Sequence, residues 1–420
     1  MVQIGVEETI KKIFSGTVVV TVGLFVNSFF SYLLHIYLGR SLTLEEYGIF
    51  NTLLSIFYLF NVFTSVISVS IIKIVSELLS QRKIDKLTAF YWKLVLYLSA
   101  LGLVIFISIS IFKNLLAEYL NITESNLFIF LGFYTLTGFL AVTMGSYVQG
   151  LLRFKLTALY YALSGILRFA LPVLFIYLGF KVNGVFFALG LGVVVCFFII
   201  TFFLQKNFEY SNEKIDVSNL YKRVLDFSIP VFFVSILMQG INTIDLLLVK
   251  KFFTGDLVGY YSGVVTIGKI ILFGAGSITI VMFPQISALM TSGKDYLSKF
   301  KFFLLLQILI TLIAYIIFSS FPGFITTLFF GDRFSESVLL LPRFVLYISL
   351  YVCSNFFITF LLAINKTNVY RLLFLPVILQ IILIYHFHGS LLEVININII
   401  ATIILLVSLL VYLYKVITAK

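Results

Sequence analysis

Long apolar runs separated by short polar stretches dominate the chain. Most runs are about 20 residues or longer, which is the length of a membrane-spanning helix, and they lack the apolar–polar alternation of barrel strands. Backbone groups inside a bilayer have no water to bond, so only helices and closed barrels span it. The pattern predicts an all-α polytopic membrane protein with about twelve transmembrane helices: 13–38, 47–75, 89–113, 126–149, 156–179, 183–205, 225–250, 257–282, 301–321, 337–363, 369–389 and 394–415.

An internal repeat organises these spans. The polar stretch 38–50, between the first two runs, recurs in weaker form at 251–261. An offset of about 211 residues aligns the two halves with about six identities over roughly 45 positions, and the hydropathy and the small residues agree. We predict two six-helix bundles that are parallel repeats. The N-terminal bundle covers 1–205, a cytoplasmic linker covers 206–223, and the C-terminal bundle covers 224–420.

Composition and charge placement support this interpretation. Hydrophobic residues make up 61% and charged residues 11% of the chain, which excludes an ordinary soluble domain. The net charge of +11 does not indicate nucleic acid as a partner, because the basic residues lie in short loops. With the N-terminus inside, twenty of the 29 Lys and Arg residues fall on the inner side and six on the outer side. This bias predicts a plasma (inner) membrane protein with both termini in the cytoplasm.

No motif of a soluble enzyme is present. The sequence contains no P-loop, no His-Glu-x-x-His and no Cys-x-x-Cys, and its outer loops are too short for a catalytic domain. We therefore expect no enzyme activity and no cofactor. His386 and His388 are two residues apart, so they point in different directions on a helix, and we expect no metal site there.

Two spans that the repeat offset pairs each carry polar residues on one helical face. On the first span these are Asn27, Ser31 and His35. On the seventh they are Ser235, Gln239, Asn242 and Asp245. Matching polar faces, one in each half, predict the lining of a water-filled cavity. The alternative is that the amides and hydroxyls hydrogen-bond between helices.

Three basic residues lie within spans, where a charge is costly and marks a cavity or a partner. Arg168 sits in the middle of the fifth span, and Pro172 leaves its carbonyl without an intrahelical donor. Lys269 lies near the middle of the eighth span with Asp245 as its nearest partner by depth. They form either a structural pair or a site that handles substrate or protons. Arg343 either snorkels to the outer surface or contacts substrate.

Two predicted cytoplasmic loops, 82–86 and 294–299, are rich in Lys. Such loops fix the topology beside anionic lipid, and this is the interpretation we favour. The alternative is that they recruit a phosphorylated lipid headgroup.

Three short motifs resemble one family. The stretch 38–50, LGRSLTLEEYGIF, is similar to the Leu-Gly … Glu-Tyr-Gly signature of polysaccharide exporters. The turns QGLLRF at 149–154 and GFKVNG at 179–184 are similar to turns of the same proteins. The chain thus resembles the polysaccharide transporter, or Wzx-type flippase, branch of the multidrug/oligosaccharidyl-lipid/polysaccharide (MOP) exporter superfamily, whose multidrug branch is the MATE transporters.

The resemblance implies a MATE-like fold, with two six-helix bundles around a V-shaped central cavity. It implies that a polyprenyl-diphosphate-linked oligosaccharide, such as an O-antigen repeat unit, crosses from the inner to the outer leaflet. Cationic lining of the cavity, as in that family, would suit Arg168 and Lys269. The first span lacks the Arg or Asp of some homologues, so we expect no diphosphate clamp on it.

Coupling and partners follow from the same resemblance. A proton or sodium gradient is the candidate driving force, with Asp245 as the candidate coupling residue. Membrane lipids and a polysaccharide polymerase, or other assembly proteins, are the candidate partners.

Two rival functions remain. A MATE-type drug/cation antiporter would share the topology, but the deep charges here are net positive and favour anionic cargo. A multispan polymerase or glycosyltransferase would need large outer loops, which this chain lacks.

Overall fold

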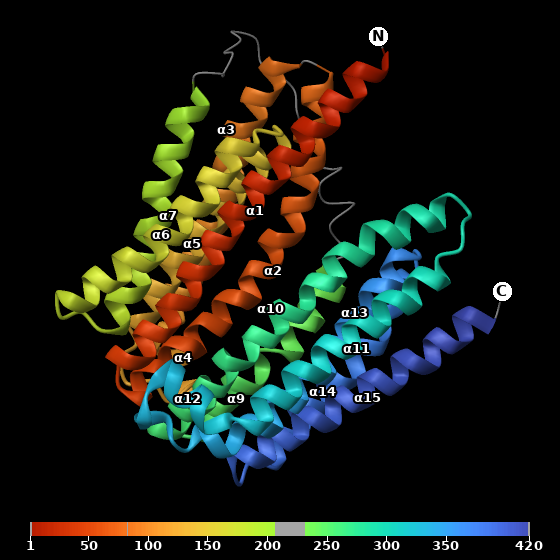
Figure 1. The fold of residues 1–420 in the computed structure, drawn as a ribbon. Helices are drawn as coiled ribbons and strands as arrows, with labels where there is room; N and C mark the ends of the chain where they lie inside the picture. Colours follow the sequence, from red (N-terminus) through yellow and green to blue (C-terminus); the bar gives the residue numbers. More distant parts are fainter. Residues whose placement is uncertain (1, 82, 206–231, 419–420) are drawn as a thin grey trace. The chain divides into compact units, whose positions relative to one another are not determined.

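The computed structural model describes residues 2–81, 83–205 and 232–418, and every regular element in these ranges is a helix (Figure 1). The chain divides into two compact units. Unit 1 draws on Met1–Ser41 and Phe60–Phe232, and unit 2 draws on Leu42–Leu59 and Phe233–Lys420.

Unit 1 is built from long helices that pack along one another. Its elements are α1 (Val2–Ser41), the later part of α2 (Leu44–Ser80), α3 (Ile84–Ile111), the short α4 (Lys113–Tyr119), α5 (Leu127–Gly150), α6 (Phe154–Tyr177) and α7 (Val182–Gln205). Helix α1 packs along α6, α3 packs against α5, and α7 contacts both α5 and α6. Phe90, Tyr147 and Cys196 belong to the buried core that α3, α5 and α7 share.

Unit 2 is centred on one helix, α13, which contacts α10, α11 and α15. Its elements are the start of α2, a helical segment Phe232–Ile241, α9 (Ile244–Phe252), α10 (Asp256–Thr291), α11 (Leu297–Ser320), α12 (Pro322–Phe330), η1 (Asp332–Phe334), α13 (Ser337–Ala363), η2 (Thr367–Val369), α14 (Tyr370–His386) and α15 (Leu391–Thr418). The buried residues of α13 include Phe344, Tyr347 and Phe356, so its apolar sequence is explained by burial as well as by lipid.

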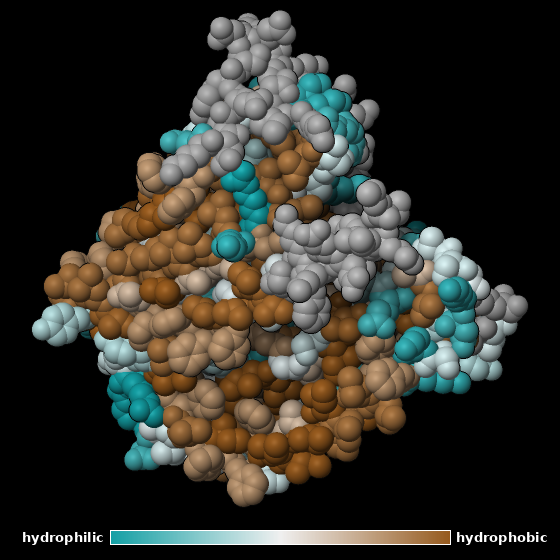
Figure 2. Space-filling model, turned by 45° about the horizontal axis from the view of Figure 1, so that its top comes forward, coloured by the Kyte–Doolittle hydropathy of each residue, from teal (hydrophilic) through white to brown (hydrophobic). Residues whose placement is uncertain are grey.

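The prediction of about twelve spans is confirmed. Among the described residues, 11 helices are long and apolar enough to cross a membrane, or 12 spans if the bent pair Phe232–Ile241 and Ile244–Phe252 counts as one. Large apolar side chains also cover much of the visible surface, shown in brown in Figure 2. An apolar surface of this extent is stable in contact with lipid rather than with water. The chain is a multi-pass membrane protein.

The structure departs most from the prediction in the seventh span, and α10 also continues to Thr291, beyond the predicted end of the eighth span at 282. The predicted seventh span, 225–250, is not one continuous helix within the described residues, because it bends by 41° between Ile241 and Ile244. The predicted ninth span, 301–321, agrees with the end of α11 at Ser320, and the short helix α12 that follows it was not predicted. Pro322 is the first residue of α12, a position that proline favours because its missing N–H would be unpaired there anyway.

The predicted domain boundary at 206–223 lies outside the described residues and stays a prediction. Within the described residues, Leu42–Leu59 packs with unit 2, although α2 continues as one helix to Ser80 in unit 1.

The stretch 38–50 sets the start of α2. The backbone N–H of Thr43 donates to the Glu46 carboxylate at 3.0 Å, and the Glu46 N–H donates to the Thr43 hydroxyl at 3.2 Å. This reciprocal pair is a capping box, which satisfies two backbone donors at a helix N-terminus. One residue later, the buried Tyr47 hydroxyl shares a 2.8 Å hydrogen bond with Thr266 of α10.

Gly48 and Gly259, which the repeat offset pairs, lie against each other. A Cβ atom on Gly48 would be 3.0 Å from the Gly259 nitrogen, and one on Gly259 would be 2.3 Å from the Leu44 carbonyl oxygen. Only glycine allows the backbones of α2 and α10 to approach this closely. In this chain the signature stretch therefore has a packing role.

Candidate functional site

Unit 1 holds a polar cluster where α1 passes α6. The side-chain amide of Asn27 donates to the Tyr161 carbonyl at 3.0 Å, and the Ser31 hydroxyl donates to the Asn27 carbonyl at 2.8 Å. The Arg168 guanidinium donates to the Ser31 hydroxyl at 3.3 Å and to the Tyr134 hydroxyl at 3.4 Å. Residues of three helices, α1, α5 and α6, thus meet at Arg168.

Small residues allow α1 and α6 to approach closely enough for these polar side chains to make contact. A Cβ atom on Gly165 would lie 2.5 Å from the Asn27 Cα, and one on Gly23 would lie 2.6 Å from the Ala158 carbonyl oxygen. Close backbone approach through small residues is the usual way in which helices pack in a membrane. Because Gly165 is three residues before Arg168, this contact places the guanidinium beside Ser31.

The Arg168 side chain is half-buried rather than sealed. Its hydrogen bonds to the two hydroxyls are longer than the usual 2.9–3.0 Å for an N–H donor, so they are weak. Two hydroxyls position a guanidinium without carrying negative charge themselves. A positioned guanidinium presents its N–H groups as a planar fork, which matches the oxygens of a phosphate or a carboxylate.

Unit 2 holds its polar cluster around the break in the seventh span. The prediction that Ser235, Gln239, Asn242 and Asp245 share one helical face is wrong for the whole set, because the helix stops at Ile241 and restarts at Ile244. Spacing defines a face only along an uninterrupted helix. Gln239 and Asn242 are half-buried, whereas Asp245 is 1% exposed.

Side chains from α13 and α14 satisfy the backbone carbonyls at the break. The Tyr351 hydroxyl donates to the Met238 carbonyl at 3.0 Å. The Ile241 carbonyl accepts from the Tyr347 hydroxyl at 2.7 Å and from the Gln380 amide at 3.1 Å. A buried carbonyl without a donor is costly inside a membrane protein, so these three side chains make the break stable.

Asp245 lies in the first turn of the helix that follows the break and is fully enclosed. Its carboxylate accepts from the Tyr261 hydroxyl at 2.6 Å, from the Leu246 N–H at 2.8 Å and from the Asn398 amide at 3.1 Å. Asn398 in turn accepts from the Gln380 amide at 2.9 Å. One atom of this network, Oε1 of Gln380, is buried without a hydrogen-bond partner among the described residues. The network thus contains an enclosed carboxylate, whose oxygens accept three hydrogen bonds, and one buried amide oxygen that accepts none among the described residues.

Lys269 lies on α10, the helix that also carries Tyr261, a hydrogen-bond donor to Asp245. Its ammonium sits over the ring of Tyr58, 4.9 Å from the centroid, in a cation–π contact. Lys269 is half-buried, whereas Asp245 is enclosed. The choice between a structural pair and a substrate or proton site stays open.

The other predicted site residues are more peripheral. His35 is half-buried one turn beyond Ser31 on α1, and Arg343 is exposed on α13. His388 stacks on Phe252 with ring centroids 3.9 Å apart, which is an interfacial packing contact. Among the described residues, no group of three potential metal ligands comes together.

Sequence reasoning missed six side chains of the two clusters. These are Tyr134, Tyr261, Tyr347, Tyr351, Gln380 and Asn398. Gln380 and Asn398 carried a usable signal, because each is an amide in the middle of an apolar span. The four tyrosines did not, since 24 tyrosines are spread along the chain.

Comparisons with known proteins agree on one superfamily. A family model described as "Polysaccharide biosynthesis protein" matches residues 13–290. An inward-facing multidrug resistance MATE family transporter of the MOP superfamily is similar in structure, with a TM-score of 0.73 and 14% identity over 96% of this chain and 99% of that chain. The lipid II flippase MurJ, in an inward closed conformation, has a TM-score of 0.71 and 17% identity over 93% and 87% of the two chains. No curated protein matches the sequence significantly.

The structural likenesses lie below 25% identity and show that the fold is that of MATE transporters and MurJ. The family model covers more than half of the chain and shows the family. The family and the structural neighbours are transporters and flippases rather than catalytic enzymes. The chain belongs to the polysaccharide biosynthesis protein family, a flippase family of the MOP superfamily.

Proposed function

We propose that this protein carries a polyprenyl-diphosphate-linked oligosaccharide, the repeat unit of a cell-surface polysaccharide, from the cytoplasmic to the outer leaflet by alternating access. The family match supports a role in polysaccharide biosynthesis. The fold shared with a lipid II flippase supports a lipid-linked cargo. The polar, charged head of such a cargo cannot cross hydrocarbon unaided.

One observation carries the choice of an anionic cargo. The two basic residues deep in spans, Arg168 and Lys269, are half-buried, whereas the acidic residue Asp245 is enclosed. Cargo that moves along the helices can therefore reach positive charge more readily than negative charge. This arrangement suits a diphosphate or an acidic sugar and does not suit an organic cation.

Arg168 is the proposed diphosphate contact. Its weak bonds to Ser31 and Tyr134 can be exchanged for charge-assisted bonds to phosphate oxygens, which are shorter and about twice as strong. Asn27, Ser31 and His35 would then offer hydrogen bonds to the sugar along α1. Gln239 and Asn242 would do so beside the break in unit 2, and Arg343 would act nearer the outer surface.

Asp245 is the proposed coupling residue. Its enclosure by Tyr261 and Asn398 excludes a bulky cargo, so the ligand we propose for it is a proton or a sodium ion. The Gln380 Oε1 atom supplies a second oxygen in the same network. Binding of a cation there would rearrange the hydrogen bonds at the helix break, and so link ion occupancy to the bend of the seventh span.

The proposed setting is the plasma (inner) membrane with both termini in the cytoplasm. The support is the excess of Lys and Arg in the loops on that side. A polysaccharide polymerase or another assembly protein on the outer side is the proposed receiver of the cargo.

The test is the transbilayer movement of a fluorescent lipid-diphosphate-oligosaccharide in vesicles that contain the purified protein. We expect Arg168→Ala and Lys269→Ala each to slow flipping by roughly tenfold or more, because a hydrogen bond to a charged group contributes about 1.5–3 kcal/mol. Lys155→Ala, at an exposed position, is the matched control and should flip at the wild-type rate. Normal flipping in both variants would remove the basic residues from the mechanism.

The same vesicles test the antiporter. Export of an organic cation by the wild-type protein, with no movement of any lipid-linked sugar, would replace the flippase by a MATE-type antiporter. Imposed proton and sodium gradients, applied separately, would show which ion drives flipping and whether Asp245→Asn abolishes the response.

A further inference from the structure

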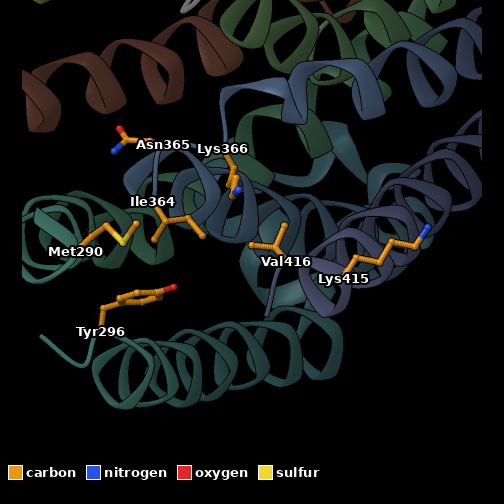
Figure 3. A pocket seen from close by; sticks show the side chains of 7 residues that line it. All are labelled: Met290, Tyr296, Ile364, Asn365, Lys366, Lys415 and Val416. Carbon is orange, nitrogen blue, oxygen red and sulfur yellow. The ribbon is translucent and has the colours of Figure 1, made fainter. Parts of the chain in front are cut away.

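A cavity of about 460 Å³ opens at one end of unit 2 (Figure 3). None of the residues that line it belongs to either polar cluster. Helices α10, α13 and α15 end there, and α11 begins there. Under the proposed orientation this end faces the cytoplasm. The transport step proposed above uses none of its lining residues.

The lining combines an apolar wall with cationic and hydroxyl groups. Met290, Ile364 and Val416 form the apolar part. Lys366 and Lys415 supply positive charge, and Tyr296 supplies a hydroxyl. In Figure 3, Lys366 turns toward the space between Ile364 and Val416, whereas Lys415 extends its ammonium away along α15. Lys415 is exposed, so its flexible side chain is free to turn inward over a bound group.

The Lys366 ammonium is not needed to cap α13. Lysines near helix C-termini often serve to bond the last carbonyls. At the end of α13, however, the backbone does so itself, since Asn365 adopts a φ of 60° and the Lys366 N–H donates to the Leu361 carbonyl at 2.9 Å. The end of this helix therefore does not require the Lys366 side chain, which lines the cavity.

The acidic residue next to the cavity is engaged elsewhere. The Asp295 carboxylate accepts from the backbone N–H groups of Leu297 at 2.9 Å and Ser298 at 3.3 Å, at the start of α11. It is thus directed at a helix N-terminus, where negative charge is favourable. The charged residues that line the cavity, Lys366 and Lys415, are both positive.

We propose that this cavity binds the phosphate headgroup of an anionic phospholipid from the cytoplasmic leaflet. Lys366 and Lys415 hold the phosphate, the Tyr296 hydroxyl donates to it, and the glycerol and upper acyl carbons lie on Met290 and Val416. Basic pockets between membrane helices on the cytoplasmic side recognise anionic lipid in this way. The inference uses only the proposed orientation and does not depend on the cargo.

The experiment measures lipid that stays bound to the full-length protein. The protein is reconstituted in bilayers of phosphatidylcholine with phosphatidylglycerol, released into detergent and weighed by native mass spectrometry. We expect phosphatidylglycerol to be retained over phosphatidylcholine, and Lys366→Gln/Lys415→Gln to lower the retention by roughly tenfold to thirtyfold. Lys83→Gln/Lys155→Gln, on unit 1, makes the same charge change and should retain the lipid.

A second variant keeps the charges and fills the space. Val416→Trp should also lose the lipid if the headgroup lies in the cavity. Retention in both pocket variants, or an equal loss in the unit 1 control, would overturn the proposal in favour of attraction to surface charge in general. Displacement of the lipid by inorganic phosphate at equal concentration would assign the cavity to a soluble phosphate and would also overturn it. A failed flipping assay would leave these binding results unchanged, so the two proposals fail separately.

Discussion

The two units bury polar groups in opposite ways. In unit 1, Arg168 is half-buried, and its hydrogen bonds to the Ser31 and Tyr134 hydroxyls are long. In unit 2, Asp245 is enclosed and accepts three bonds, two of them shorter than 3.0 Å. Weak bonds can be exchanged at low cost, whereas an enclosed carboxylate is costly to disturb. The comparison suggests that unit 1 is suited to meeting cargo and that unit 2 is suited to holding a small ion at a fixed bend.

The two cysteines of the chain allow each unit to be followed alone. Cys196 lies in the core of unit 1, and Cys353 is half-buried in unit 2. Replacing one cysteine by serine leaves a single thiol, whose reaction with a fluorogenic maleimide on heating reports the unfolding of its own unit.

The largest effect is expected from Asp245→Leu. The substitution leaves the Tyr261 hydroxyl, the Leu246 N–H and the Asn398 amide buried without their acceptor, which should destabilise unit 2 by about 3 kcal/mol or more. The Cys353 thiol should react at a markedly lower temperature. Asp245→Asn keeps an oxygen acceptor and should lose less. If Arg168→Ala lowered the unfolding temperature of unit 1 as much, the contrast between the units would be wrong.

The contrast also marks what the sequence could and could not predict. The twelve spans, the membrane class and the superfamily followed from hydropathy and short motifs. The break at 241–244 did not, because polar residues at spacings of four, three and three imitate one continuous helical face. The donors that make the break stable, Tyr347 and Gln380, lie more than 100 residues away from Ile241 in the sequence. No feature of the sequence near Ile241 indicates such a contact.

Asn27, Ser31 and Arg168 were each recognisable in the sequence, but their contacts with one another were not. The sequence singled out Asn27, Ser31 and Arg168 separately, as polar groups in apolar spans. Their meeting depends on Gly165 and Gly23, whose packing role becomes visible only when α1 lies against α6. Polar residues in spans were therefore predictable, and their partners were not.

Gly165→Ala should give the second-largest effect. The added methyl would meet the Asn27 Cα at 2.5 Å, and backbone cannot move aside as a side chain does. Helices α1 and α6 must separate, at a cost of about 1–3 kcal/mol, and Arg168 then loses Ser31. The Cys196 thiol should react earlier on heating, and flipping should slow. Gly192→Ala, on α7 of the same unit, would place the new methyl 3.5 Å from its nearest neighbours, which is an ordinary contact, and is the control that should show neither change.

Arg168→Lys separates charge from geometry in unit 1. Lysine keeps the positive charge but lacks the fork that reaches both Ser31 and Tyr134. We expect flipping several-fold slower than wild type and faster than Arg168→Ala, with an unchanged Cys196 unfolding temperature. A rate equal to that of wild type would mean that charge alone matters and that the hydroxyls do not position the guanidinium for cargo.

The smallest effects test the break itself. Tyr347→Phe removes one of two donors to the Ile241 carbonyl, and Gln380 remains at 3.1 Å, so unit 2 should lose only about 0.5 kcal/mol. Tyr351→Phe removes the hydroxyl that caps the Met238 carbonyl at 3.0 Å and should cost about 1 kcal/mol. The order, with Tyr351→Phe the more harmful in the Cys353 assay, is the result that matters. The reverse order would mean that the Gln380 amide does not compensate for the lost Tyr347 hydrogen bond to the Ile241 carbonyl. Its bond to Asn398 would then be its main role, and the link between the helix break and the Asp245 network would be lost.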